Sequence, residues 1–277
     1  MRLVVCIALL SPFFLRAQER NAQTQTSNLN QHIHEFSTVN SPTAGDFDIS
    51  NFIQKLSNKQ TRSSSLQFCR AIFNKTSQEY LRRYDQYASF AETLERGKYN
   101  CLTGTALYAV LLNHFGIPFT IIETNYHIFL LASTEEGAAL FEATDPLDGF
   151  VTDPSEIEQR LQLYKLRSSQ VLPLDGRRYY SFTAALYQPV NLTELRGLLH
   201  YNVATEAYNN QDFARAIKHL DQAFTLYSSP RIAEFSSVLL RALIQSNLDK
   251  STREHYISQV KSIRKRLPVM ASRSNSH

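Results

Sequence analysis

Apolar side chains recur at helical spacing from residue 47 onward. A spacing of three and four residues places such side chains on one face of a helix. A second periodic run extends from Leu66 to Tyr84. The pattern therefore predicts two or three amphipathic helices between residues 47 and 84. The apolar positions of the first run are Phe47, Ile49, Phe52, Ile53 and Leu56.

A more continuously apolar helix is predicted between Asn100 and Gly116. Asn is a residue type that commonly caps the first turn of a helix, whereas Gly116 and Pro118 are typical of the point where a helix ends. Most side chains from Leu102 to Leu112 are apolar. Because a helix that is apolar on all sides must be buried, we expect this one at the centre of its domain.

Three short runs rich in branched and aromatic residues follow. They extend from Phe119 to Glu123, from His127 to Leu131 and from Ala139 to Ala143, with a turn sequence at residues 135–137. These runs predict a small antiparallel sheet. Beyond Gly149 no period is clear, and we interpret residues 171–190 as a linker.

Helical spacing returns after residue 191. One helix is predicted over residues 191–208 and a second over 213–224, separated by a polar break. Small residues at their contact positions let two antiparallel helices approach closely. The pair resembles one tetratricopeptide repeat, a helix–turn–helix unit of 34 residues. The residues that carry this resemblance are Ala204, Phe213, Ala216 and Ala223.

Two further helices are predicted to complete this C-terminal part. They extend from Pro230 to about Asn247 and from Ser251 to about Leu267. They would form a degenerate repeat or a cap, and an ordinary helical bundle is the alternative. Residues 191–270 are accordingly predicted to be an all-α domain.

The N-terminal 45 residues differ in composition from the rest. Residues 1–17 combine a basic start, a short apolar stretch and a small residue, Ala17, which is typical of a cleaved secretory signal. The alternative is a buried N-terminal helix or strand. Residues 18–45 are rich in Gln, Asn, Ser and Thr, and we interpret them as a disordered tether. The protein is thus expected to be exported, to the periplasm or the cell surface.

Composition narrows the classes of function. The chain has 277 residues, 43% of them apolar, and a net charge of +4, which suits two globular domains and does not predict nucleic-acid binding. No later segment is long enough for a membrane span. Cys69 and Cys101 remain after processing, and an oxidising compartment would permit one disulfide between them.

One set of residues suggests nucleophilic chemistry. Cys101 stands at the head of the apolar helix, where unpaired N–H groups and the helix dipole favour a thiolate. His127 opens an apolar strand and has no obvious packing role there, so it is a candidate base. The next strand supplies Glu142 and Asp145 as candidate acids. Strand alternation places these two carboxylates on opposite faces, so at most one should meet His127.

This order of a helix-head Cys, a strand His and an acid on the neighbouring strand resembles the transglutaminase-like superfamily of papain-type cysteine enzymes. The sequences that carry the resemblance are Asn-Cys-Leu-Thr-Gly-Thr-Ala-Leu-Tyr at 100–108, Leu-Leu-Asn-His-Phe-Gly-Ile-Pro at 111–118 and Phe-Glu-Ala-Thr-Asp-Pro at 141–146. The resemblance implies an α+β papain/transglutaminase-like domain over residues 46–170, with helices packed on a small antiparallel sheet, ahead of the tetratricopeptide-like helices. It makes Cys101 the nucleophile, His127 the base and Glu142 or Asp145 the orienting acid.

Two functions are compatible with this sequence. The first is acyl transfer or amide hydrolysis through a thioester on Cys101. The second is a non-catalytic binding or assembly protein that holds a peptide or protein partner on its helical repeats. We expect neither a cofactor nor a metal, because the sequence has no Gly-rich phosphate loop and its His pairs lack ligand spacing.

Overall fold

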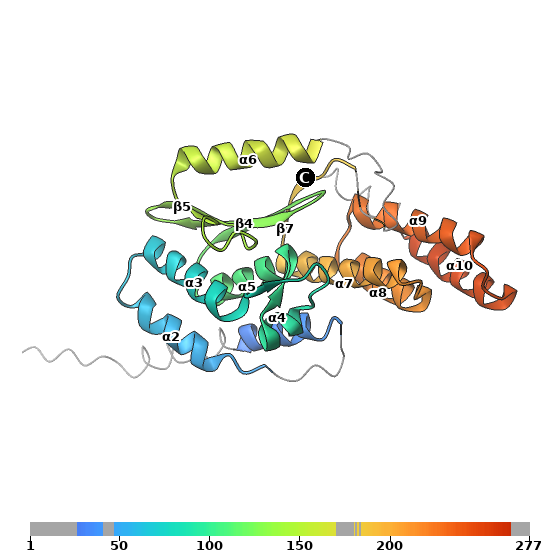
Figure 1. Cartoon of the computed structure of the whole chain (residues 1–277), viewed down its shortest axis with the longest axis horizontal. Coiled ribbons are helices and arrows are strands. Elements are labelled where there is room, and N and C mark those ends of the chain that lie inside the picture. Colours follow the sequence, from blue (N-terminus) through green and yellow to red (C-terminus); the bar gives the residue numbers. More distant parts are fainter. Residues whose placement is uncertain (1–26, 41–46, 170–179, 181, 183, 267–277) are drawn as a thin grey trace, which may run out of the picture.

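The computed structural model describes residues 27–40, 47–169, 180, 182 and 184–266. Its centre is a five-stranded antiparallel sheet in the order β6-β5-β4-β3-β7, with α5 on one face and α6 on the other (Figure 1). The predicted α+β class is confirmed. The strands are β3 (Phe119–Thr124), β4 (Ile128–Thr134), β5 (Gly137–Phe141), β6 (Phe150–Val151) and β7 (Tyr187–Val190), and the two helices are α5 (Cys101–His114) and α6 (Pro154–Ser169).

Alternation along β4 explains why this sheet is covered on both sides. Ile128, Leu130 and Ala132 belong to the large cluster around α5, whereas Phe129 belongs to a smaller cluster with Ile157 of α6. Pairing of β4 with β3 and with β5 is antiparallel. The three predicted strands are thus confirmed, although β4 begins at Ile128, one residue after His127.

Helix α5 has the predicted limits and the predicted central position. The Asn100 side chain accepts a hydrogen bond from the Thr103 amide at 2.9 Å, and the Thr103 hydroxyl accepts one from the Asn100 amide at 3.0 Å. Gly116 follows the helix with a φ of 68°, the left-handed region that favours glycine. Gly104 lets the first turn approach the end of β5, since a Cβ there would lie 2.7 Å from that of Ala143.

Further elements surround α5: the first two helices reach its C-terminal end, and a short helix with a two-stranded sheet lies at its head. Helices α2 and α3 fall where the periodicity predicts them, and the parallel pair β1–β2 brackets α4. Strand β2 ends one residue before Asn100, the N-cap of α5. The packing of β1, β2 and α4 therefore fixes where the helix begins. The elements are α2 (Ser50–Gln60), α3 (Ser65–Tyr80), β1 (Arg83–Tyr84), α4 (Phe90–Arg96) and β2 (Lys98–Tyr99).

Residues 18–45 are predicted to be a disordered tether, and the structure describes residues 27–40 of this range. For these residues the prediction is wrong. Residues 27–37 are helical, and Leu29, Ile33 and Phe36 are buried, with the Phe36 ring edge-on to Phe90 at 5.4 Å. Their spacing is that of a helix face, which the Gln- and Asn-rich composition obscured. The predicted signal peptide at residues 1–17 lies outside the described residues.

The stretch without a clear period contains two elements that sequence analysis missed. Helix α6 buries only Ile157 and Ser168, because it rests on the sheet by one narrow face, so its periodicity is weak. Strand β7 lies within the predicted linker, yet it pairs with β3 at the edge of the sheet, Val190 opposite Ile121. The linker assignment of residues 187–190 is therefore wrong.

The C-terminal helices begin and end close to their predicted limits, and they share a core with the sheet. One continuous buried cluster includes Leu107 of α5 and Leu198 of α7 as well as Leu239 of α9. Figure 1 shows α7 beside α5, with α9 and α10 extending away from the sheet. The helices are α7 (Leu192–Asn209), α8 (Phe213–Leu226), α9 (Pro230–Gln245) and α10 (Lys250–Lys265). No helix in the described part of the chain is long and apolar enough to cross a membrane.

Close packing of α7 against α8 depends on small residues and generates a stability prediction. Ala223 is fully buried, and a Cβ on Gly197 would lie 2.7 Å from that of Tyr227. Ala223→Leu should lower the free energy of unfolding by about 1–3 kcal/mol, because the extra methyl groups have no room. Urea denaturation measures this, and Ala214→Leu on the exposed side of α8 is the matched control. Equal stability of the two variants would contradict the packing argument.

A pair of histidines between α7 and α8, of which His219 is buried and His200 half-buried, generates a pH prediction. The Nδ1 atoms of His200 and His219 lie 3.0 Å apart, and burial together with neighbouring cationic groups lowers the pKa of each to about 4. Unfolded histidines bind protons near pH 6.5, so the unfolded state takes up more protons as the pH falls. The free energy of unfolding should therefore decrease from about pH 6.5 towards pH 4. His219→Gln should flatten this slope, and an unchanged slope would exclude the pair as its source.

Candidate active site

Cys101 is the first residue of α5, and the cap of that helix holds it in place. The side-chain amide nitrogen of Asn100 donates to the backbone carbonyls of Gln86 and Ala88 at 3.1 Å each. These two bonds tie the helix head to the loop before α4. Cys101 is free and partly exposed. Cys69 is also free but completely buried, and burial raises the pKa of its thiol to about 11. The disulfide that the sequence permits does not form between them.

His127 sits at the tight turn between β3 and β4. The Thr124 amide donates to the His127 carbonyl at 2.7 Å, and the His127 amide donates to the Thr124 hydroxyl at 2.8 Å. The same hydroxyl donates back to the His127 carbonyl at 3.0 Å. Three hydrogen bonds thus fix the backbone from which the imidazole projects, while Asn125 and Tyr126 form the tip of the turn.

Glu142 directly follows β5 and meets the His127 ring. Glu142 Oε2 lies 2.5 Å from His127 Nε2 and accepts a hydrogen bond from the Tyr164 hydroxyl at 3.1 Å. Its other oxygen accepts from the Thr144 amide at 3.1 Å and the Thr144 hydroxyl at 2.7 Å. Burial alone would raise the pKa of this carboxyl, but the bonds from His127 and Thr144 outweigh burial and lower it. Glu142 is therefore a buried carboxylate.

The imidazole bridges this carboxylate and the thiol. Burial alone would lower the pKa of His127, but hydrogen bonds with Cys101 and Glu142 and the charge of Glu142 raise it to about 10. Nε2 is engaged with Glu142, and Cys101 and His127 line the same cavity. This arrangement orients the imidazole and stabilises its cation.

Asp145, the other candidate acid, lies away from His127 in the turn after β5. Its Oδ1 accepts from the Asp148 amide at 2.9 Å, and its Oδ2 lies 3.8 Å from an Arg160 nitrogen. Gly149 closes this turn, since a Cβ there would come within 2.3 Å of the Glu142 and Asp145 carbonyl oxygens. Asp145 therefore shapes the segment that carries Glu142, and its predicted role as the orienting acid is wrong in this geometry.

Tyr164 of α6 completes the site, and sequence analysis did not find it. Its hydroxyl bonds Glu142, and its ring lies 5.8 Å from the His127 ring and 4.6 Å from that of Phe129. The apolar spacing of Ile157, Leu161 and Tyr164 was the signal available, because these positions share one helical face.

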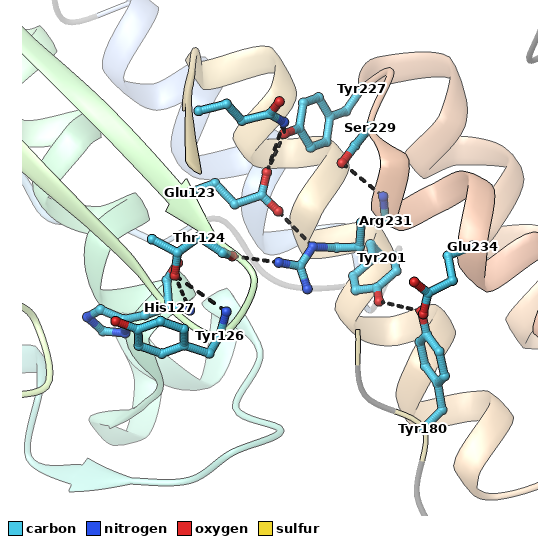
Figure 2. A network of polar contacts seen from close by, with 11 residues as sticks. Glu123, Thr124, Tyr126, His127, Tyr180, Tyr201, Tyr227, Ser229, Arg231 and Glu234 are labelled. Carbon is cyan, nitrogen blue, oxygen red and sulfur yellow. Dashed lines mark hydrogen bonds and ion pairs between the residues drawn. The ribbon is translucent and has the colours of Figure 1, made fainter. Parts of the chain in front are cut away.

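A buried ion pair connects the C-terminal helices to the turn that carries His127 (Figure 2). Arg231, the second residue of α9, donates from Nε to Glu123 at 2.7 Å and from its terminal nitrogen to the Thr124 carbonyl at 2.7 Å. Tyr227 also donates to Glu123, which is only 2% exposed. The predicted repeat region thus supports the hairpin that carries His127, and sequence analysis gave no indication of this contact.

Within the described ranges, no three His, Cys, Asp or Glu side chains are grouped so that they could hold a metal ion.

Comparisons of the chain with protein-family models, with curated proteins and with solved structures found no match.

The buried ion pair generates a prediction for stability. Arg231→Met should lower the free energy of unfolding by about 3–5 kcal/mol, because it leaves the Glu123 carboxylate buried without its cation. Adding Glu123→Gln should restore part of that loss. Urea denaturation of the single and double variants measures both effects. Arg253→Met on α10 is the control, and equal losses from the single and double variants would contradict a coupled pair.

Proposed function

We propose that this protein is an exported cysteine enzyme of the acyl-transfer or amide-hydrolysis type, similar to the transglutaminase-like superfamily in its order of site residues. The observation that carries the proposal is the pairing of His127 with Glu142 beside Cys101, which lines the same cavity as His127. Export rests on the character of residues 1–17 alone. The similarity of the C-terminal helices to tetratricopeptide repeats belongs to the same proposal.

Each side chain has a defined task in the proposed reaction. The proton of Cys101 is held by His127, and the sulfur attacks the carbonyl carbon of an amide, so that a C–S bond forms. The C–N bond then breaks as the imidazolium gives its proton to the departing amine. Water or a second amine attacks the thioester while the now neutral His127 takes its proton, and the C–S bond breaks so that the sulfur leaves beside the protonated His127, as at the start. Glu142 keeps the ring oriented throughout.

The position of Cys101 also supports stabilisation of the intermediate. A tetrahedral intermediate carries negative charge on the former carbonyl oxygen. Backbone N–H groups in the first turn of a helix have no partner within the helix, and Cys101 is the first residue of α5. The Cys101 amide is therefore the donor that we assign to this oxygen.

The competing proposal is a binding or assembly protein in which the helices hold a peptide or protein partner. A cavity of about 630 Å³ at the turn between α7 and α8 favours it, with Tyr208, Phe213 and Leu248 in its wall. The two proposals differ in what they require of Cys101. Catalysis needs a reactive thiol that depends on His127, whereas partner binding does not.

Alkylation of the folded protein tests the catalytic proposal. At pH 7, Cys101 should react with iodoacetamide much faster than Cys69, which is buried and carries a raised thiol pKa of about 11. His127→Ala should slow Cys101 by about tenfold, because the side chain proposed to accept the thiol proton is then missing. Rates are measured across pH by mass spectrometry of the labelled peptides.

Two controls make this result interpretable. Cys101→Ala should remove the fast phase, and His114→Ala, at the other end of α5, should leave it unchanged. Identical pH profiles for the parent protein and His127→Ala would remove the catalytic pair and leave the binding proposal.

A further inference from the structure

The guanidinium of Arg231 is held by three separate parts of the chain. Its central carbon lies 4.6 Å from the centre of the Phe182 ring and 5.3 Å from that of the Tyr201 ring, distances at which an aromatic face attracts a cation. Its Nε and a terminal nitrogen donate to the Glu123 carboxylate and the Thr124 carbonyl at 2.7 Å each (Figure 2). Only 12% of the side chain is exposed, so these contacts confine the guanidinium to one place.

A single residue, Thr124, links Arg231 to the backbone of His127. The Thr124 carbonyl accepts the bond from Arg231, while the Thr124 amide and hydroxyl make the three hydrogen bonds that hold the His127 backbone. Because all four bonds meet at one residue, a shift of Thr124 moves the turn and the imidazole with it. His127 Nε2 lies 2.5 Å from Glu142, and such a shift would lengthen and weaken this bond.

Arg231 performs two tasks that differ in the chemistry they require. Neutralising Glu123, which is 2% exposed, requires a positive charge, and a lysine ammonium would also supply one. Reaching Glu123 and the Thr124 carbonyl together uses two nitrogens that a rigid planar group holds apart. A lysine has one nitrogen on a flexible chain, so it would keep the ion pair and lose the fixed contact with the turn. The charge therefore serves stability, and the planar shape serves position.

We propose that Arg231 is a positioning residue of the active site: acting through Thr124, it holds the imidazole of His127 against Glu142 and beside Cys101. The proposal rests on the proposed function, because it assigns Arg231 a part in that reaction. Helix α9 then belongs to the active site and is no separate appendage, since its second residue aligns the base.

The test is a double-mutant cycle on the alkylation of Cys101 by iodoacetamide. Rates are measured on the full chain for the parent protein, Arg231→Lys, His127→Ala and the double variant. Arg231→Lys should slow the reaction about fivefold, roughly the contribution of one hydrogen bond. In the His127→Ala background the same substitution should change nothing, because the side chain through which Arg231 acts is missing. Arg241→Lys, at an exposed position of α9, is the matched control and should leave the rate unchanged.

An NMR signal reports the position of the imidazole independently of the thiol. The proton between His127 Nε2 and Glu142 lies in a short, charge-assisted hydrogen bond, so its resonance should appear far downfield. Arg231→Lys should move this resonance upfield as the bond lengthens, and Arg241→Lys should leave it in place. A protein that is generally destabilised would instead expose Cys69, which is completely buried in the folded chain, to labelling.

Two outcomes would overturn the proposal. One is a slowing by Arg231→Lys that persists in the His127→Ala background, and the other is an unchanged imidazole resonance in Arg231→Lys. If Arg231→Lys exposes Cys69, the cycle is repeated with Arg231→Gln combined with Glu123→Gln, which leaves no buried charge unpaired, and the same two outcomes decide. The proposed function is judged separately by His127→Ala alone. If Cys101 reacts as fast in that variant as in the parent protein, catalysis is rejected, and the resonance still decides whether Arg231 positions the ring.

Discussion

The buried carboxylate of Glu142 is the constraint on which the site depends. A carboxylate that is only 5% exposed has to be compensated by hydrogen bonds and by charge, or it would take up a proton. Its partners come from the hairpin turn (His127), from the segment after β5 (Thr144) and from α6 (Tyr164). Meeting this requirement brings three separate parts of the chain to the same place, next to the head of α5.

Close packing brings Cys101 to that carboxylate. Gly104 allows the first turn of α5 to lie against Ala143, one residue after Glu142. The Asn100 cap fixes the start of the helix, and Thr124 fixes the turn that carries His127. The positions of the three side chains are therefore set by backbone elements and their caps, so the proposed reaction would need little further ordering of these side chains.

Much of the fold could be predicted from the sequence wherever periodicity is strong. Helix α5 and the strands β3 to β5 have close to their predicted limits, because they are apolar and are bounded by capping or turn residues. Helix α6, strand β7 and the helix at residues 27–37 could not be assigned, because each buries few side chains or lies within polar sequence.

The Cys, His and acid candidates of the site were found from the sequence, since their residue types and their order are visible in the chain. The sequence could not decide between Glu142 and Asp145 as the partner of His127. Strand β5 ends at Phe141, and the turn around Gly149 decides where each carboxylate lies. The Arg231 contact was missed because it joins residues 107 positions apart.

The contact between Arg231 and the Thr124 carbonyl joins residues that are far apart in the chain, and this separation has a consequence for how the protein is synthesised. Strand β3 acquires its partner β7 only after residue 190 has left the ribosome, and its turn acquires Arg231 still later. A nascent chain that ends before these points carries Cys101 and His127, yet it lacks one edge of the sheet and the cation that Glu123 needs. Non-local contacts of this kind form late and slowly. Completion of the sheet around His127 is thereby coupled to synthesis of residues 187–231, and a product that ends before them would contain Cys101, His127 and Glu142 without strand β7 and without the cation that pairs with Glu123.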